Sequence, residues 1–118
     1  MLDPILLILV MLFIKHWYID FVNQSYEEIC RKGDYLNWTG MKHSVKHGFG
    51  TFFVFFWFTN LYAAATLALV DFLIHYHIDY FKMKYGEVRM TRKRYWIHLG
   101  ADQLAHHLTY LGLVWSLL

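Results

Sequence analysis

The 39 residues from His43 to Phe81 read HSVKHGFGTFFVFFWFTNLYAAATLALVDFLIHYHIDYF, and they contain no proline. A single helix of this length would extend about 58 Å at 1.5 Å per residue, which is more than the thickness of a bilayer. Thr59 and Asn60 form the one plausible turn in the stretch, although neither glycine nor proline marks it. The stretch therefore predicts two antiparallel membrane spans, at about 43–60 and 62–82.

The rest of the chain also has the composition of a small membrane protein. Of its 118 residues, 58% are hydrophobic and 20% aromatic, and it has one proline and one cysteine. This composition excludes a disordered chain and a disulfide-linked scaffold. Apolar segments at about 4–22 and 96–118 predict two further spans, separated from the central pair by polar loops at 23–42 and 83–95. The predicted fold is an all-α integral membrane four-helix bundle, formed by residues 1–118 as a single membrane domain.

Lysine and arginine residues are concentrated in these two loops. Ten of the 11 lie in or beside them, whereas the amino terminus and the predicted turn carry none. Basic loops remain in the cytosol when a membrane protein inserts, so both loops are expected there and both chain termini outside. The formal net charge of +2 is too small to indicate a nucleic-acid partner.

Histidine and aspartate residues recur at intervals of four in every predicted span. The sets are His16 with Asp20, His43 with His47, Asp71 with His75 and Asp79, and Asp102 with His106. Residues four apart share one helix face, and all of these lie within roughly 17 Å of the predicted cytosolic helix ends. Carboxylates at such depth are costly unless they are paired or solvated. The pattern predicts an intramembrane polar cluster near the cytosolic face.

Imidazole and carboxylate are the usual ligands of zinc, manganese and iron, so the cluster predicts a site for one or two divalent metal ions. The expected metal ligands are His16, Asp20, His47, Asp71, His75, Asp79, Asp102 and His106. The imidazoles of His16, His75 and His106 are favoured among them, and the candidate catalytic carboxylates are Asp20, Asp79 and Asp102. His43, Gln24 and Gln103 are expected to support the ligands from behind. Any one pair alone is more typical of an interhelical hydrogen bond.

Other polar residues near the spans are expected to lie outside the cluster. His77, His98 and His107 point away from the polar faces or lie near the interface. Lys15 is expected to extend to the cytosolic surface along its own helix. Lys82 is expected in the solvated loop, with pairing to a carboxylate or a substrate phosphate as the alternative.

Two motifs resemble those of a family of small uncharacterised membrane proteins from bacteria and their phages. The stretch from His16 to Gln24, HWYIDFVNQ, has the form H-x3-D-F-x2-Q, and the stretch from Asp102 to His106, DQLAH, has the form D-Q-x2-H. The resemblance covers most of the chain. It implies four membrane helices with this polar pattern, in the inner membrane of a bacterium or of a phage-infected host, and it implies no reaction.

The polar cluster predicts a metal-dependent membrane hydrolase that acts on a lipid or lipid-linked substrate from the cytosolic leaflet. Three alternatives remain open. They are a b-type haem protein with two axial histidines, a cation or proton pathway along Asp71, His75 and Asp79, and a structural membrane factor whose polar core fixes helix packing. Membrane lipid is the expected partner, and the sequence is compatible with both a monomer and a homodimer.

Overall fold

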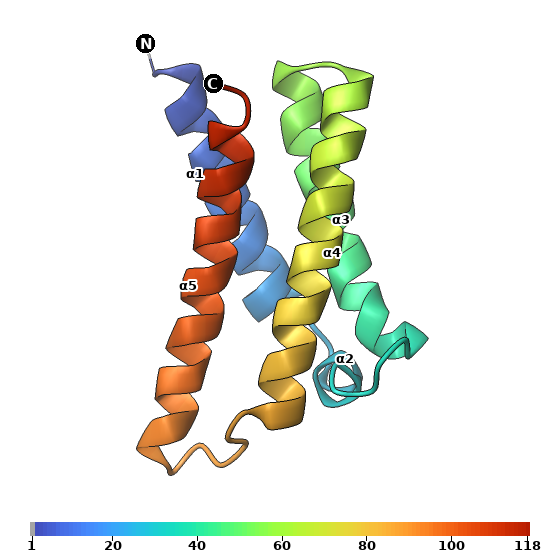
Figure 1. The fold of residues 1–118 in the computed structure, drawn as a ribbon, viewed down its shortest axis with the longest axis vertical. Helices are drawn as coiled ribbons and strands as arrows, with labels where there is room; N and C mark the ends of the chain where they lie inside the picture. Colours follow the sequence, from blue (N-terminus) through green and yellow to red (C-terminus); the bar gives the residue numbers. More distant parts are fainter. Residues whose placement is uncertain (1) are drawn as a thin grey trace.

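The computed structural model describes residues 2–118, which form helices and connecting turns. In chain order the elements are α1 (Pro4–Trp17), the π-helical segment η1 (Tyr18–Val22), α2 (Tyr26–Arg31), α3 (Trp38–Phe58), α4 (Leu61–Tyr85) and α5 (Lys93–Trp115). No strand occurs in this described range, so the prediction of an all-α fold is confirmed. The four long helices lie side by side, with α1 and α4 each packing against α3 and α5 (Figure 1).

Polar side chains cap the first four of these α-helices. Asp3, Ser25, Asn37 and Asn60 each accept a hydrogen bond from a backbone N–H of the first turn that follows. Such caps satisfy donors that have no partner within the helix. The cap at Asn37 explains why α3 begins at Trp38 rather than near 43, so that the predicted 23–42 loop contains α2 and the start of α3.

The central hairpin reverses where the sequence predicts it. Helix α3 ends at Phe58 and α4 begins at Leu61, which leaves Thr59 and Asn60 as the turn. The Thr59 hydroxyl donates to the Phe55 carbonyl at 2.6 Å, and the Asn60 side chain accepts from the Ala63 N–H at 3.0 Å. These two hydrogen bonds explain how the chain turns here without glycine or proline.

The two ends of the molecule differ in character. Both termini lie at one end, and α2 and the connection between α4 and α5 lie at the other (Figure 1). The terminal half contains an apolar core drawn from all four long helices. It comprises Ile8, Leu12, Val54, Phe55, Ala64, Leu67, Tyr110, Leu113 and Val114. The polar cluster occupies the other half.

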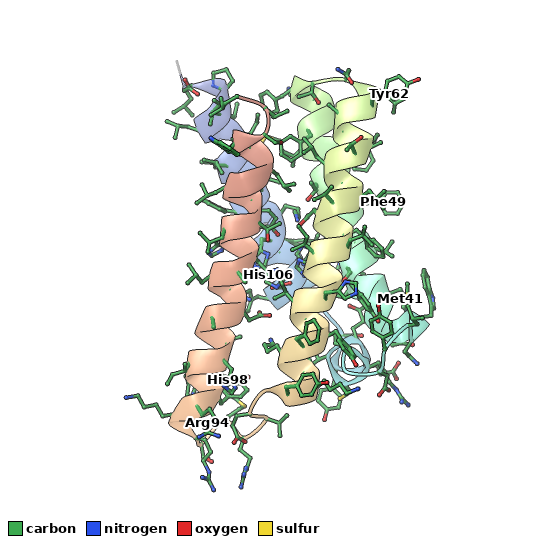
Figure 2. All side chains as sticks on the ribbon, viewed as in Figure 1. Met41, Phe49, Tyr62, Arg94, His98 and His106 are labelled. Carbon is green, nitrogen blue, oxygen red and sulfur yellow. The ribbon has the colours of Figure 1, made fainter. Side chains whose placement is uncertain are left out.

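Polar side chains make up an unusually large share of the buried residues. Almost as many polar or charged side chains as hydrophobic ones are buried, while large apolar side chains cover the outside. Phe49 and Tyr62 point outward with 62% and 86% of their surface exposed, whereas His106 lies between the helices with 1% exposed (Figure 2).

Two helices are long and apolar enough to cross a membrane, by length and composition. They are α1 continued through η1, Pro4–Val22, with a mean hydropathy of 2.0, and α4, Leu61–Tyr85, with a mean hydropathy of 1.4. Helices α3 and α5 have 21 and 23 residues, but more polar sequences. The structure thus gives an all-α chain with two candidate spans where the sequence predicts four.

Gly40 provides a test of how α2 packs against α3. A Cβ atom at Gly40 would collide with the backbone carbonyl of Arg31 at the end of α2. Gly40→Ala is therefore expected to lower the free energy of unfolding by about 1–3 kcal/mol, measured by denaturant unfolding in detergent solution. Gly100→Ala is the matched control, because a Cβ there meets nothing within 4 Å. The control is expected to gain up to about 1 kcal/mol from helix propensity, and equal losses at both positions would contradict the packing.

Candidate metal centre

Five histidines and three aspartates meet in the half of the bundle opposite the termini. They are His16 on α1, Asp20 on η1, His43 and His47 on α3, His75 and Asp79 on α4, and Asp102 and His106 on α5. Figure 2 shows the labelled His106 at the centre of this region, between the helices. The structure therefore brings together residues from all four predicted polar faces.

The Asp20 carboxylate lies at the centre of the cluster. Its Oδ1 is 2.8 Å from the Nε2 atoms of both His43 and His47, and its Oδ2 is 3.0 Å from Nε2 of His16. Asp20 lies within the π turn, where the Asn23 N–H donates to the Tyr18 carbonyl at 2.8 Å. Such turns insert an extra residue into a helix, and they are frequent at functional sites.

Two sets of donor atoms are spaced to hold a metal ion. Asp20, His43, His47 and His75 each offer one atom within 4.8 Å of the others, and so do His75, Asp79 and His106. His75 belongs to both sets, and its ring stacks between those of His47 at 3.8 Å and His106 at 3.9 Å. Three imidazoles and one carboxylate are a donor set that suits zinc, iron or manganese.

His43 and His75 are buried with unused hydrogen-bonding capacity. Both ring nitrogens of each residue lack a hydrogen-bond partner among residues 2–118. Yet His43 Nε2 is 2.8 Å from Asp20 Oδ1, and His75 Nε2 is 3.3 Å from Asp79 Oδ2. A ring nitrogen and a carboxylate oxygen that both point toward the same ion lie close together without being aligned for a hydrogen bond to each other. A buried polar atom left unsatisfied costs about 1–3 kcal/mol, so these nitrogens indicate a ligand-binding site.

Lysine side chains neutralise every carboxylate around the centre except one. The pairs are Lys15 with Asp71 at 3.4 Å, Lys32 with Asp79 at 3.2 Å, Lys46 with Glu28 at 2.7 Å and Lys82 with Asp102 at 3.5 Å. Asp20 contacts only histidines and Gln103 within the described chain. Asp20 is therefore the one carboxylate of the cluster whose side-chain partners are imidazoles and an amide rather than a lysine.

The roles expected for His16 and His43 are reversed in the structure. His16 shares hydrogen bonds with the Tyr110 hydroxyl at 2.8 Å through Nδ1 and with Gln103 Oε1 at 2.7 Å through Nε2. Both of its ring nitrogens are therefore engaged, and it lies behind Asp20, outside both donor sets. His43, which the sequence places among the supporting residues, has free ring nitrogens and lies in the first donor set.

Lys15 lies inside the bundle, so the prediction that it extends to the surface is wrong. Its Nζ is 3.1 Å from His47 Nδ1 and 3.0 Å from the Tyr110 hydroxyl, and its side chain is only 8% exposed. The path is open because Gly50 has no side chain: a Cβ there would be 2.6 Å from Lys15 Cγ. Asp71, an expected metal ligand, is held by Lys15 and by the Thr51 hydroxyl, and it belongs to neither donor set.

The remaining expected residues lie at different distances from the donor sets. Gln103 supports the cluster as expected, since its Nε2 donates to Asp20 Oδ2 at 3.2 Å and to Asp102 Oδ2 at 3.1 Å. Gln24 donates instead to the backbone carbonyl of Asp20, at 2.8 Å. Asp102 lies outside both donor sets, with its Oδ1 3.4 Å from His106 Nε2.

Of the side chains that were expected outside the cluster, Lys82 contacts it, whereas His77 and His98 do not. Lys82 reaches Asp102, which is the pairing alternative, and its side chain is 23% exposed. His77 shares a hydrogen bond with the Tyr35 hydroxyl, and His98 accepts one from the Glu87 N–H. Neither histidine belongs to a donor set.

Two buried residues that the sequence analysis did not include come from the connection between η1 and α3. Glu28 is 3% exposed and Lys32 is 6% exposed. Glu28 Oε2 lies 3.8 Å from His43 Nδ1, and neither atom has a hydrogen-bond partner among the described residues. The S-x-x-E pattern from Ser25 to Glu28 is a helix-start signal that could have located Glu28. No spacing signal marks Lys32.

Comparisons with known proteins give one match. The family model described as "Protein of unknown function (DUF3307)" matches residues 8–118. No curated protein and no solved structure matches the chain.

The Lys15–Asp71 pair provides a test of charge compensation. Lys15→Met leaves a buried unpaired carboxylate, so it is expected to lower the free energy of unfolding by about 3–5 kcal/mol. Combining it with Asp71→Asn removes both charges and is expected to restore much of this loss in a double-mutant cycle. Arg31→Met is the control, because it breaks an exposed pair with Asp34 and is expected to cost under about 1 kcal/mol. Additive effects of the Lys15 and Asp71 substitutions would argue against a compensated pair.

Proposed function

Because this chain belongs to the DUF3307 family of proteins of unknown function, we propose its role from its own site: a metal-dependent membrane hydrolase that acts on a lipid or lipid-linked substrate. The observation that carries the proposal is the first donor set. Asp20, His43, His47 and His75 offer four ligand atoms within 4.8 Å of one another, from three different helical elements. Two of these histidines have no hydrogen-bond partner for either ring nitrogen within residues 2–118.

The two donor sets share His75, so we place one ion, bound by the first set. Zinc, manganese and iron fit its mixture of imidazole and carboxylate. Glu28 is placed to hold the His43 ring from the other side, since its free Oε2 faces the free Nδ1 at 3.8 Å. A carboxylate behind a ligating imidazole fixes the ring and strengthens the ligand.

Asp79 and His106 are assigned to proton transfer. Asp79 Oδ1 is 3.0 Å from His106 Nε2, and its Oδ2 is 3.2 Å from Lys32 Nζ. This pairing keeps Asp79 beside the donor set as a base, and Asp102 Oδ1 approaches the same Nε2 atom of His106 at 3.4 Å. A bound divalent ion supplies Lewis acidity, which lowers the pKa of water to about 7 and polarises the bond to be cleaved.

The proposal places all four long helices in a membrane, with the polar cluster toward the cytosol. Exposed aromatic and aliphatic side chains over the outer surface support this setting. The longest dimension of the molecule, 44 Å, matches a bilayer with its headgroup regions, which is about 40–45 Å. The basic segments lie at the end opposite the termini, which supports an orientation with the termini outside in a bacterial inner membrane.

The geometry favours this function over the alternatives. The stacked rings of His47, His75 and His106, at 3.8 and 3.9 Å, leave no slot for a porphyrin between them. A pathway across the membrane would have to pass the apolar core of the terminal half, in which Leu12 and Phe55 are 0% exposed. A purely structural cluster would leave the buried Nδ1 atoms of His43 and His75 without hydrogen-bond partners among the described residues.

Metal content tests the donor set. The full chain, purified in detergent, is expected to contain about one equivalent of zinc, manganese or iron by elemental analysis. His43→Ala and Asp20→Asn remove ligands and are expected to lower metal affinity at least about tenfold. His77→Ala is the control, because His77 is half-buried, bonded to Tyr35 and outside both donor sets. Metal-free wild-type protein would remove the proposal, and two equivalents would contradict the assignment of one ion to the first donor set.

Hydrolysis tests the assignment of Asp79. Metal-loaded protein is expected to release fatty acid or a phosphorylated headgroup from phospholipid vesicles. Asp79→Asn is expected to lower kcat by about 10²–10⁴-fold while the metal content stays near one equivalent. His77→Ala again serves as the control. A full rate in Asp79→Asn would exclude it as the base, and no release by the loaded wild-type protein would exclude hydrolysis of phospholipids.

A further inference from the structure

A groove of about 430 Å³ lies between the cytosol-directed parts of α4 and α5. Its walls are mainly apolar, with Ile78 and Phe81 on one side and Ala101 and Ala105 on the other. The small side chains on α5 leave room for an alkyl chain. In the proposed membrane setting, the apolar part of the groove would face the hydrocarbon region, where lipid chains are the available occupants.

The middle of the groove is polar. Lys82 and Asp102 line it between Ile78 and Ala105 on one side and Gly86 and His98 on the other, with Lys82 Nζ 3.5 Å from Asp102 Oδ2. Lys82 keeps part of its side chain accessible, which leaves it free to contact a further anion. Asp102 is 5% exposed, and its Oδ1 has no hydrogen-bond partner in the described part of the chain. The Lys82 ammonium group can bind a phosphate, and the Asp102 carboxylate can accept a hydrogen bond from a hydroxyl group in the same lipid headgroup.

The end of the groove at Gly86 and His98 is surrounded by basic residues. Arg89, Arg92, Lys93 and Arg94 are exposed on the connection between α4 and α5 and on the first turn of α5. Figure 2 shows Arg94 projecting from this end of the molecule, close to His98 at the groove. The only carboxylate in this connection, Glu87, is bonded to Arg89. Such a surface attracts lipids with a net negative charge.

The polar middle of the groove adjoins the candidate metal centre. Asp102 Oδ1 lies 3.4 Å from His106 Nε2, and His106 contacts Asp79 at 3.0 Å. We propose that this groove binds one chain of an anionic glycerophospholipid, with the phosphate at Lys82 and a headgroup hydroxyl at Asp102. The inference rests on the proposed function, because it supplies the substrate class of that hydrolase.

A second groove offers an internal comparison. It has about 390 Å³ and lies between α3 and α4, where Gly48, Phe49, Ala65 and Phe72 contribute to its walls. No charged residue lines it. If hydrophobic volume alone selected lipids, both grooves would bind them equally well.

The first experiment tests whether Lys82 selects the lipid headgroup. The full chain in detergent is mixed with phosphatidylglycerol or phosphatidylcholine, and retained lipid is counted by native mass spectrometry. We expect one phosphatidylglycerol to be retained in preference, and Lys82→Gln to lower its retention about fivefold. Lys93→Gln removes the same charge outside the groove and is expected to retain the wild-type preference. Equal losses in the two variants would overturn the proposal in favour of general surface attraction.

The second experiment tests the apolar walls. Ala105→Leu fills the α4–α5 groove, and Ala65→Leu fills the α3–α4 groove with the same change in volume. Only Ala105→Leu is expected to reduce retention of phosphatidylglycerol. Retention that Ala105→Leu leaves unchanged, or that inorganic phosphate alone abolishes, would overturn the lipid assignment, because the site would then recognise phosphate without a chain.

Metal content, measured on each variant, separates this inference from the proposed function. Loss of lipid preference in a protein that keeps its metal overturns the groove assignment alone. A metal-free wild-type protein that still prefers phosphatidylglycerol through Lys82 overturns the hydrolase and leaves the lipid site in place.

Discussion

The arrangement of the polar half depends on the Asp20 carboxylate, which is the one carboxylate of the cluster without a lysine partner. Three imidazoles approach its two oxygens at 2.8–3.0 Å, from α1 and α3, and Gln103 reaches it from α5. Every other buried acid around it is neutralised by a lysine. A buried carboxylate with imidazole nitrogens close to both of its oxygens offers a cation several donor atoms at one level of the bundle, which is where polar side chains from all four long helices converge.

The lysine–carboxylate pairs also determine how the helices are joined. Lys15 connects α1 to Asp71 on α4, and Lys32 connects the end of α2 to Asp79 on the same helix. Lys46 and Glu28 join α3 to α2, and Lys82 joins α4 to Asp102 on α5. Because removing one partner leaves a buried charge, each pair specifies one arrangement of its two elements. The small helix α2 is therefore part of the polar half, although it is too short to span a membrane.

Spacing of four residues was sufficient to predict which helix faces meet, because that spacing fixes a face whatever the neighbouring helices do. The spacing could not predict which of His16 and His43 is the ligand and which is the supporting residue. That depends on the rotation of α1 and α3 about their axes and on the π turn at Asp20. The path of Lys15 depends on the missing side chain of Gly50, a residue distant in sequence. The turn at Thr59 and Asn60 was predictable because helix length requires a reversal there, whereas the helix start at Trp38 depends on a single capping side chain.

The apolar core between the cluster and the termini has an electrical consequence. In a membrane, the potential difference falls mainly across the region that excludes water and ions, which here is the layer around Leu12, Phe55 and Leu113. In the proposed membrane setting, the polar cluster would remain close to the potential of the cytosol. Protons taken up or released at the cluster would return to the cytosol, so turnover would neither dissipate nor draw on the energy stored across the bilayer.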